Sequence, residues 1–284
     1  MAGTLYLVAT PIGNLEDITH RALKVLASVN LIACEDTRRT RVLLDHYGIK
    51  AKLTSYHEHN ERERAGELAE ILEAGSDVAL VSDAGTPGIN DPGFRLVQES
   101  ALRGLRVVPV PGPTAFVAAL VASGLPTDQF FFGGFLPARS TQRRARLSEV
   151  CGLPSTLIFY EAPHRIHEAL LDAREILGER AGVVVREITK VHEEILRGRL
   201  SELAEHFAAG DAARGEMVLL IDRNPIGEGL PEKNSAEMVA ARVAALEQEG
   251  LNAREALKRT ARELGLSRSE AYRRLTAHKA RERA

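Results

Sequence analysis

The chain has 284 residues, of which 44% are hydrophobic and 27% are charged, and its formal net charge is −2. This length suggests about two domains, and no apolar run reaches the ~18 residues that a membrane-spanning helix needs. The N-terminal sequence lacks the basic and apolar segments of a signal peptide. Cys34 and Cys151 have no zinc-site spacing. We therefore expect a cytoplasmic protein with reduced thiols and no membrane partner.

Charge is distributed unevenly along the chain. The segment from Arg254 to Ala284 contains ten Lys/Arg and four Asp/Glu residues, a net charge of +6, which leaves −8 for the rest. An acidic body joined to a basic C-terminal segment suggests a polyanionic partner for that segment.

Short apolar runs alternate with amphipathic helical patterns through residues 1–124. The runs are rich in Val, Ala and Leu, as expected of strands that are buried on both faces of a parallel sheet. The predicted strands are 5–9, 31–34, 52–56, 78–81 and 106–110, and the predicted helices are 18–29, 39–47, 61–72, 93–102 and 114–122. This alternation predicts an α/β domain with a mostly parallel sheet.

A second α/β domain is predicted over residues 125–224, after a linker at 124–128. Its predicted strands are 130–135, 156–160, 182–186 and 217–221, and its predicted helices are 142–150, 165–176 and 200–209. The expected fold class is therefore α/β, with two consecutive α/β domains, a cleft between them and a small all-α domain at the C-terminus.

The C-terminal domain, residues 235–284, follows a second linker at 224–234 and reads as helices 235–249, 253–264 and 267–278. The pattern from Ser267 to Glu270 predicts a capping box at the start of the last helix. A tight helix-turn-helix whose second helix is basic fits nucleic-acid docking, although a small capping bundle with a solvated basic face is an alternative. The basic side chains concerned are Arg268, Arg273, Arg274 and Lys279.

The loop after residues 78–81 is the most unusual of the strand ends. The apolar run stops at Ser82 and Asp83, and a segment rich in Gly and Pro leads to the next helix. Such a segment fixes an uncommon backbone path and lets a ligand approach the main chain closely. In open α/β sheets, ligands bind beyond the carboxyl ends of the strands.

Several common site motifs are absent from the sequence. It has no GxxxxGK[ST], no GxGxxG after the first strand, no HExxH and no GxSxG. His57, Glu58 and His59 could suggest a metal site, but no third ligand is evident, and we expect none. If both sheets direct their strand ends at one cleft, that cleft gathers amides, carboxylates, His, Arg and Lys, which describes a group-transfer site without naming the reaction.

Seven stretches, with the same order and spacing, resemble the 16S rRNA (cytidine-2′-O-)-methyltransferase family, a branch of the tetrapyrrole-methylase-like S-adenosylmethionine enzymes. They are LYLVATPIGNLEDIT, ACEDTRRT, SYHEHN, LVSDAGTPGINDPG, VPGPTA, FYEAPHR and REITK. The stretches run across roughly residues 4–190, and the C-terminal helix-turn-helix is similar to the small domain appended to that family. The resemblance implies a tetrapyrrole methylase-like fold, usually a homodimer, with S-adenosylmethionine in the cleft between the α/β domains.

The resemblance also implies roles for individual residues. The cofactor would be held by Pro11, Ser82, Asp83, Gly85, Thr86, Ile89, Pro113, Thr114, Tyr160, Glu161 and Ala162. The implied substrate is a cytidine ribose in the decoding region of 16S rRNA, within the assembled small subunit. Arg38 and Arg39 could meet its phosphates.

A general base would help the reaction, because the pKa of a ribose 2′-hydroxyl lies far above neutral. Our candidates are His57, Glu58 and His59, with Glu187 and Lys190 as polar neighbours. Each of these side chains could equally be a structural hydrogen-bonder in a polar cleft.

Two other functions remain open at this point. One is another methyltransferase of the same superfamily, acting on a corrinoid or on a diphthamide precursor, although the basic helical segment argues against a small substrate. The other is a transcriptional regulator in which an α/β ligand sensor is fused to a DNA-reading helix-turn-helix.

Overall fold

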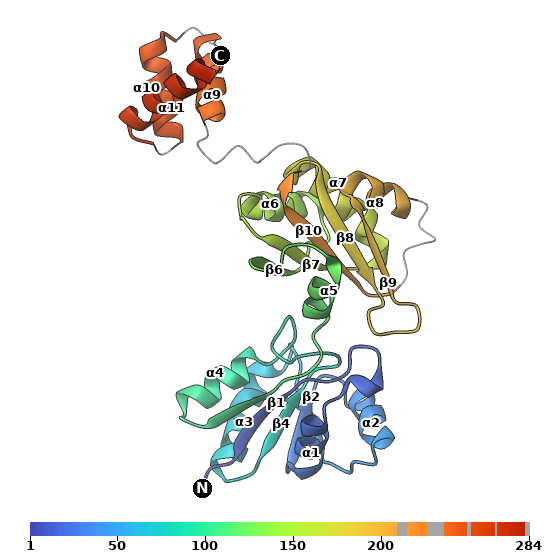
Figure 1. Cartoon of the computed structure of the whole chain (residues 1–284). Helices are drawn as coiled ribbons and strands as arrows, with labels where there is room; N and C mark the ends of the chain where they lie inside the picture. The colour runs from blue at the N-terminus through green and yellow to red at the C-terminus, as the bar shows by residue number, and fades with distance from the viewer. Residues whose placement is uncertain (209–214, 226–235, 249–250, 265, 282–284) are drawn as a thin grey trace.

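The computed structural model describes residues 1–208, 215–225, 236–248, 251–264 and 266–281. Within these residues, two five-stranded sheets and a group of three helices follow one another along the chain (Figure 1). No helix in the described part is both long enough and apolar enough to cross a membrane.

The first sheet is entirely parallel, in the order β3-β2-β4-β1-β5. Its strands are β1 (Thr4–Val8), β2 (Leu31–Cys34), β3 (Leu53–Ser55), β4 (Val78–Val81) and β5 (Arg106–Val110). The helices around it are α1 (His20–Ser28), α2 (Thr37–His46), α3 (Glu61–Glu73) and α4 (Phe94–Leu102), with a 3-10 turn, η1, at Leu15–Asp17. The predicted parallel α/β sheet is confirmed.

Helices cover both faces of this sheet, and β4 shows why its sequence is continuously apolar. All four residues of β4 are buried. Ala79 and Val81 belong to the cluster that contains residues of α1 and α2. Val78 and Leu80 belong to the cluster on the opposite face, with residues of α3 and α4. Alternate side chains of a strand point to opposite faces, so a doubly covered strand needs apolar residues throughout.

Helix α5 (Ala115–Ser123) packs against the second sheet rather than the first. Its residues Ala119 and Leu120 share a buried cluster with Ile158 and Leu220 of that sheet. Arg197 donates hydrogen bonds to the Ala122 and Ser123 carbonyl oxygens at 2.6 and 2.8 Å, at the helix C-terminus, where a cation is favourable. The sequence analysis assigned α5 to the first domain. The domain boundaries themselves stay predictions.

The second sheet is mixed, in the order β6-β7-β10-β8-β9, and β6 and β7 form its parallel pair. Its strands are β6 (Phe130–Phe135), β7 (Thr156–Glu161), β8 (Arg180–Arg186), β9 (Glu194–Arg199) and β10 (Met217–Pro225). Its other face is covered by α6 (Ser140–Val150), α7 (Ile166–Leu177) and α8 (Leu200–Phe207), with a 3-10 turn, η2, at Pro163–Arg165. The sequence analysis missed β9. This strand lies at the sheet edge, where its charged sequence EILRGR does not look like a buried strand.

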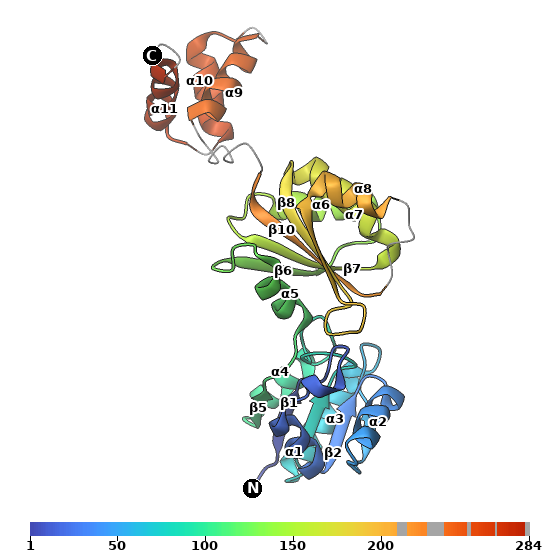
Figure 2. The same cartoon turned by 45° about the vertical axis from the view of Figure 1, so that its right-hand side comes forward.

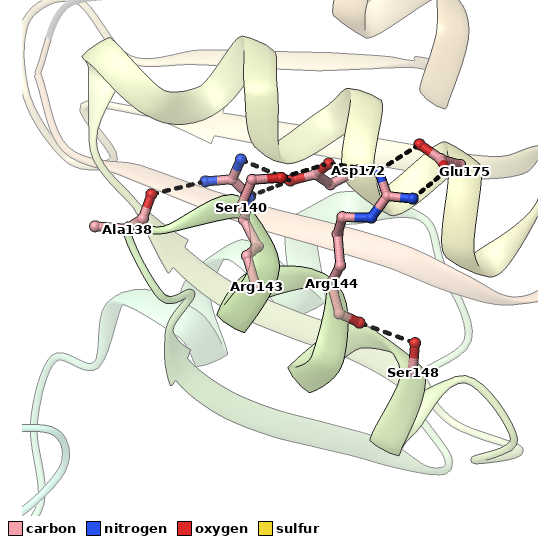
Figure 3. A network of polar contacts seen from close by, with 7 residues as sticks. All are labelled: Ala138, Ser140, Arg143, Arg144, Ser148, Asp172 and Glu175. Carbon is pink, nitrogen blue, oxygen red and sulfur yellow. Dashed lines mark hydrogen bonds and ion pairs between the residues drawn. The ribbon is translucent and has the colours of Figure 1, made fainter.

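A buried ion pair joins α6 to α7 beneath this sheet (Figure 3). Arg143, which is 3% exposed, approaches Oδ2 of Asp172 at 2.6 Å, and Ser140 donates to the same oxygen at 2.9 Å. Arg143 also donates to the Ala138 carbonyl at 3.3 Å. Removing one partner of such a pair leaves a buried charge without compensation.

We therefore predict that Asp172→Ala lowers the free energy of unfolding by about 3–5 kcal/mol in urea denaturation. The matched control is Glu175→Ala, on the same helix, because Glu175 pairs with Arg144 at the surface and such pairs contribute about 0–1 kcal/mol. Equal losses for both variants would contradict this account of the pair.

The described C-terminal residues form three helices, α9 (Ala236–Gln248), α10 (Ala253–Glu263) and α11 (Arg268–Arg281), around their own small core (Figure 1). Of the predicted capping box, the described residues show one of the two bonds: Ser267 Oγ accepts a hydrogen bond from the Glu270 amide at 3.2 Å. The Glu270 carboxylate pairs with Arg273 and Arg274. Most of the predicted linker 224–234 lies outside the described residues, as does Gly265.

Candidate active site

The carboxyl ends of the first sheet's strands face the second sheet (Figure 2). A cavity of about 280 Å³ is lined by residues of both parts. The first part of the chain lines it with Ile12, Glu35, Arg39, Asp83, Ala84, Gly85, Thr86, Ile89, Asn90, Asp91, Thr114 and Ala115. The second sheet and its loops contribute Phe135, Tyr160, Ile188, Glu216, Met217 and Val218. The cleft that the sequence predicted between two sheets is therefore present.

Hydrogen bonds between loops fix the floor of this cavity. The backbone of Thr10, after β1, donates to the Gly85 carbonyl at 2.9 Å, and the Gly85 amide donates back at 3.0 Å. The Thr10 hydroxyl also donates to the Ser82 carbonyl at 3.1 Å. Gly85 has a φ of 86°, which glycine adopts without a steric penalty. The β1 and β4 loops therefore form one unit.

Thr86 ties the same loop to the start of α5. Its hydroxyl lies 2.8 Å from the Thr114 hydroxyl and 3.2 Å from the Pro113 carbonyl, to which it donates. Both threonines line the cavity.

Two close approaches connect the two sides of the cleft. A Cβ atom added at Gly134 would lie only 2.5 Å from Oδ1 of Asn90, which itself has a φ of 62°. A side chain at Gly13 would similarly collide with Lys190. At both glycines a side chain of one side lies against the backbone of the other, so a larger residue would have to displace that side chain.

The carboxylates that line the cavity differ in their hydrogen-bond and ion-pair partners. Asp83 accepts a hydrogen bond from the Asp36 amide at 3.0 Å and pairs with Arg39 at 3.2 Å. Within the described residues, Glu35 and Asp91 form no ion pair. Burial, reinforced by the neighbouring Glu35, raises the pKa of Asp91 to about 6. Burial and the charge of Asp83 likewise raise the pKa of Glu35.

The structure brings most of the proposed cofactor residues together. Six of them line the cavity: Asp83, Gly85, Thr86, Ile89, Thr114 and Tyr160. Pro11 and Ser82 line an adjoining cavity of about 130 Å³ that shares Arg39 and Asp83 with the first. Among the described residues, Pro113, Glu161 and Ala162 line neither cavity. Buried Glu161 instead accepts hydrogen bonds from the Ala162 amide and from Arg165, at 2.8 and 2.9 Å.

The proposed bases lie near the cavity without lining it. His57, Glu58 and His59 follow β3, and the last two side chains are exposed. Lys190 pairs with Glu187 at 3.0 Å and with Glu216 at 3.3 Å. Of these five proposed residues, none is in the cavity wall, whereas Glu216, which Glu187 and Lys190 contact, is.

The proposed RNA-contacting residues are separated in the structure. Arg39 lines the cavity, whereas Arg38 is bound to Asp36, and this hydrogen bond lowers the pKa of Asp36 to about 2. Arg268 is exposed, and the side chain of Lys279 lies outside the described part. Arg273 and Arg274 are paired with Glu270. In the part of the chain that is described, no cluster of His, Cys, Asp or Glu could hold a metal ion.

Sequence reasoning did not single out Glu35 and Asp91. Both stand within the stretches that carry the family resemblance, and Glu35 directly follows the strand β2. Both residues could have been identified from the rule that polar residues at the carboxyl ends of parallel strands lie at the same edge of the sheet. Phe135 and Glu216 had no comparable signal.

We predict that Asp91→Asn stabilises the protein at pH 8 by about 1–3 kcal/mol. A carboxyl whose pKa is raised by folding destabilises the folded state once it ionises, so the cost is present above pH 6 and absent near pH 4. Urea unfolding at both pH values checks this, with Asp45→Asn at the exposed end of α2 as control. A stability difference that does not vary with pH would refute the assignment.

A family model, individual proteins and a solved structure match this chain. The family model of Tetrapyrrole (Corrin/Porphyrin) Methylases matches residues 4–204. "Ribosomal RNA small subunit methyltransferase I" of Mesorhizobium japonicum is 55% identical over 218 residues, which are 76% of this chain and 74% of that protein. The protein of the same name from Halalkalibacterium halodurans is 47% identical over 274 residues, 95% of this chain and 93% of its own. A crystal structure of cobalt precorrin-4 methyltransferase has the same fold, with a TM-score of 0.56, 18% identity and coverage of 77% and 94%.

Proposed function

The chain belongs to the tetrapyrrole methylases and, within them, to the ribosomal RNA small subunit methyltransferase I family, and we propose that it methylates the 2′-hydroxyl of a cytidine in the decoding region of 16S rRNA. The observation that carries this proposal is the similarity to a protein of that name along 95% of the chain. The enzyme uses S-adenosylmethionine, as its family does.

The residues of the cleft fit this cofactor. Its sulfonium and ammonium groups are positive, and Glu35, Asp83 and Asp91 surround the cavity with carboxylates. The apolar and aromatic side chains of Ile89 and Tyr160 suit a purine and its ribose. When bound, S-adenosylmethionine supplies a methyl group on a positively charged sulfur, which is transferred to a nucleophile in line.

The protein's part in the reaction is then to position the ribose and accept its proton. We assign the proton acceptor to Asp91, because it lies in the cavity wall on the same loop as Gly85 and Ile89. It forms no ion pair within the described residues, and a pKa near 6 suits a base that works near neutral pH. His57, Glu58 and His59 follow the carboxyl end of β3, at the sheet edge that carries the cavity, where they would position the nucleotide. Glu187 and Lys190 would brace the loop that touches Gly13.

Arg39 has a double role in this proposal. Its guanidinium holds Asp83 at 3.2 Å while its side chain is 69% exposed, so it can also meet an RNA phosphate. Arg38 is 89% exposed and lies next to it. We further propose that the substrate is the assembled small subunit, that the enzyme is a homodimer and that it works in the cytoplasm.

The function is tested by incubating the protein with labelled S-adenosylmethionine and small subunits from cells that lack the enzyme, with deproteinised rRNA in parallel. We expect a ribose methyl group on one cytidine of 16S rRNA, located by mass mapping. Label in a corrinoid or in a protein, with none in rRNA, would overturn the proposal.

The assignment of the base predicts that Asp91→Asn lowers the methylation rate at saturating S-adenosylmethionine by about 10²–10⁴-fold. Single-turnover rates of Asp91→Asn, Glu58→Gln and His59→Ala should be compared, with Asp45→Asn as the surface control. Near-normal turnover of Asp91→Asn, together with a large loss of turnover in His59→Ala, would indicate that the proton acceptor is among the residues after β3.

A further inference from the structure

A groove between α10 and the start of α11 exposes an aromatic ring. Tyr272 is 62% exposed, whereas Leu257, which is 7% exposed, belongs to the core of the three helices. The two residues line the groove together with Leu275, Arg254 and Arg268. The groove therefore brings one exposed aromatic ring and two arginines together.

The arginines at this groove differ from most other cations of the C-terminal helices, because they lack acidic partners. Arg273 and Arg274 pair with Glu270, and Arg242 and Arg259 pair with Glu263. Within the described residues, by contrast, Arg254 and Arg268 form no ion pair. Positive charge that is not neutralised therefore concentrates at the groove.

A basic stripe continues from the groove along the exposed face of α10. Arg254, Lys258 and Arg262 follow one another at four-residue spacing and are all exposed, and none of them is in an ion pair in the described part of the chain. Residues four apart lie on one helix face. The stripe offers a path for a phosphate backbone that leads to the aromatic ring.

We propose that this groove binds an unpaired nucleotide of the RNA substrate, with its base stacked on Tyr272 and its phosphates held by Arg254 and Arg268. An exposed aromatic ring beside free cations suits a single strand, whose bases are open to stacking, better than a duplex, whose bases already stack on each other. The inference rests on the proposed function for its partner, and it differs from docking by the basic face of α11, since Arg273 and Arg274 are paired.

The test uses the full-length protein and two fluorescent probes, a 12-nucleotide single-stranded RNA of the decoding-region sequence and the same sequence as a duplex. Tyr272→Ala should weaken binding of the single strand by about 5–150-fold, because stacking contributes ~1–3 kcal/mol per base. Tyr272→Phe keeps the ring and should bind within about twofold of wild type. Circular dichroism melting checks that the exposed substitutions leave the fold intact.

The arginines are tested by salt dependence. Replacing Arg254 and Arg268 together by Ala should lower the slope of log affinity against log salt by about 1–2. Arg273→Ala is the matched control, because its side chain is 77% exposed but paired with Glu270. It should change affinity and slope little.

The outcomes separate this inference from the proposed function. The proposed nucleotide binding by the groove would be overturned by any of three results, whatever the methylation assay shows. Tyr272→Ala could bind RNA like the wild type, it could lose affinity equally for single strand and duplex, or the wild-type protein could bind neither probe. Conversely, Tyr272→Ala could lose single-strand binding while the wild type methylates no rRNA. That result would contradict the proposed function and support nucleotide binding by the groove.

Discussion

The pairing of Thr10 with Gly85 is the contact on which the cleft depends. Two backbone hydrogen bonds join the loops after β1 and β4, and Asp83, held by Arg39 and by the Asp36 amide, adds the end of β2. Neighbouring parallel strands therefore end in one cross-linked edge rather than in separate loops. Such an edge presents backbone groups and carboxylates to a ligand in fixed positions, which lowers the cost of ordering them on binding.

Charge is divided between two parts of the molecule because the enzyme must bind two different ligands. Carboxylates line a cleft that suits a cationic cofactor, and the same charges repel RNA. The affinity for a polyanion must therefore come from elsewhere, and in our proposal the unpaired cations of α10 and the start of α11 supply it. Arg39 could serve both the binding of the cofactor and the binding of RNA, because it is paired with Asp83 and is also open to solvent.

The sequence predicted the first sheet well, because doubly covered parallel strands are continuous apolar runs such as that of β4. It did not predict β9, an edge strand whose sequence EILRGR is half charged, nor the packing of α5 on the second sheet. In the site, Glu216 lines the cavity only because β10 runs antiparallel between β7 and β8, so that the residue before this strand lies at the cleft, which local sequence does not reveal. Asp91 is a candidate proton acceptor because it is buried beside Glu35. Arg273 is unsuited to binding RNA because it is paired with Glu270. Both depend on three-dimensional neighbours.

The central claim is that the cleft between the two sheets holds S-adenosylmethionine through the strand-end loops. Hydrogen–deuterium exchange of the full-length protein, with and without S-adenosylhomocysteine, tests the location directly. We expect slower exchange in the ligand-bound protein in four segments: 10–14, 82–93, 111–114 and 160–162. Protection confined to other parts of the chain, or none at saturating ligand, would contradict the account.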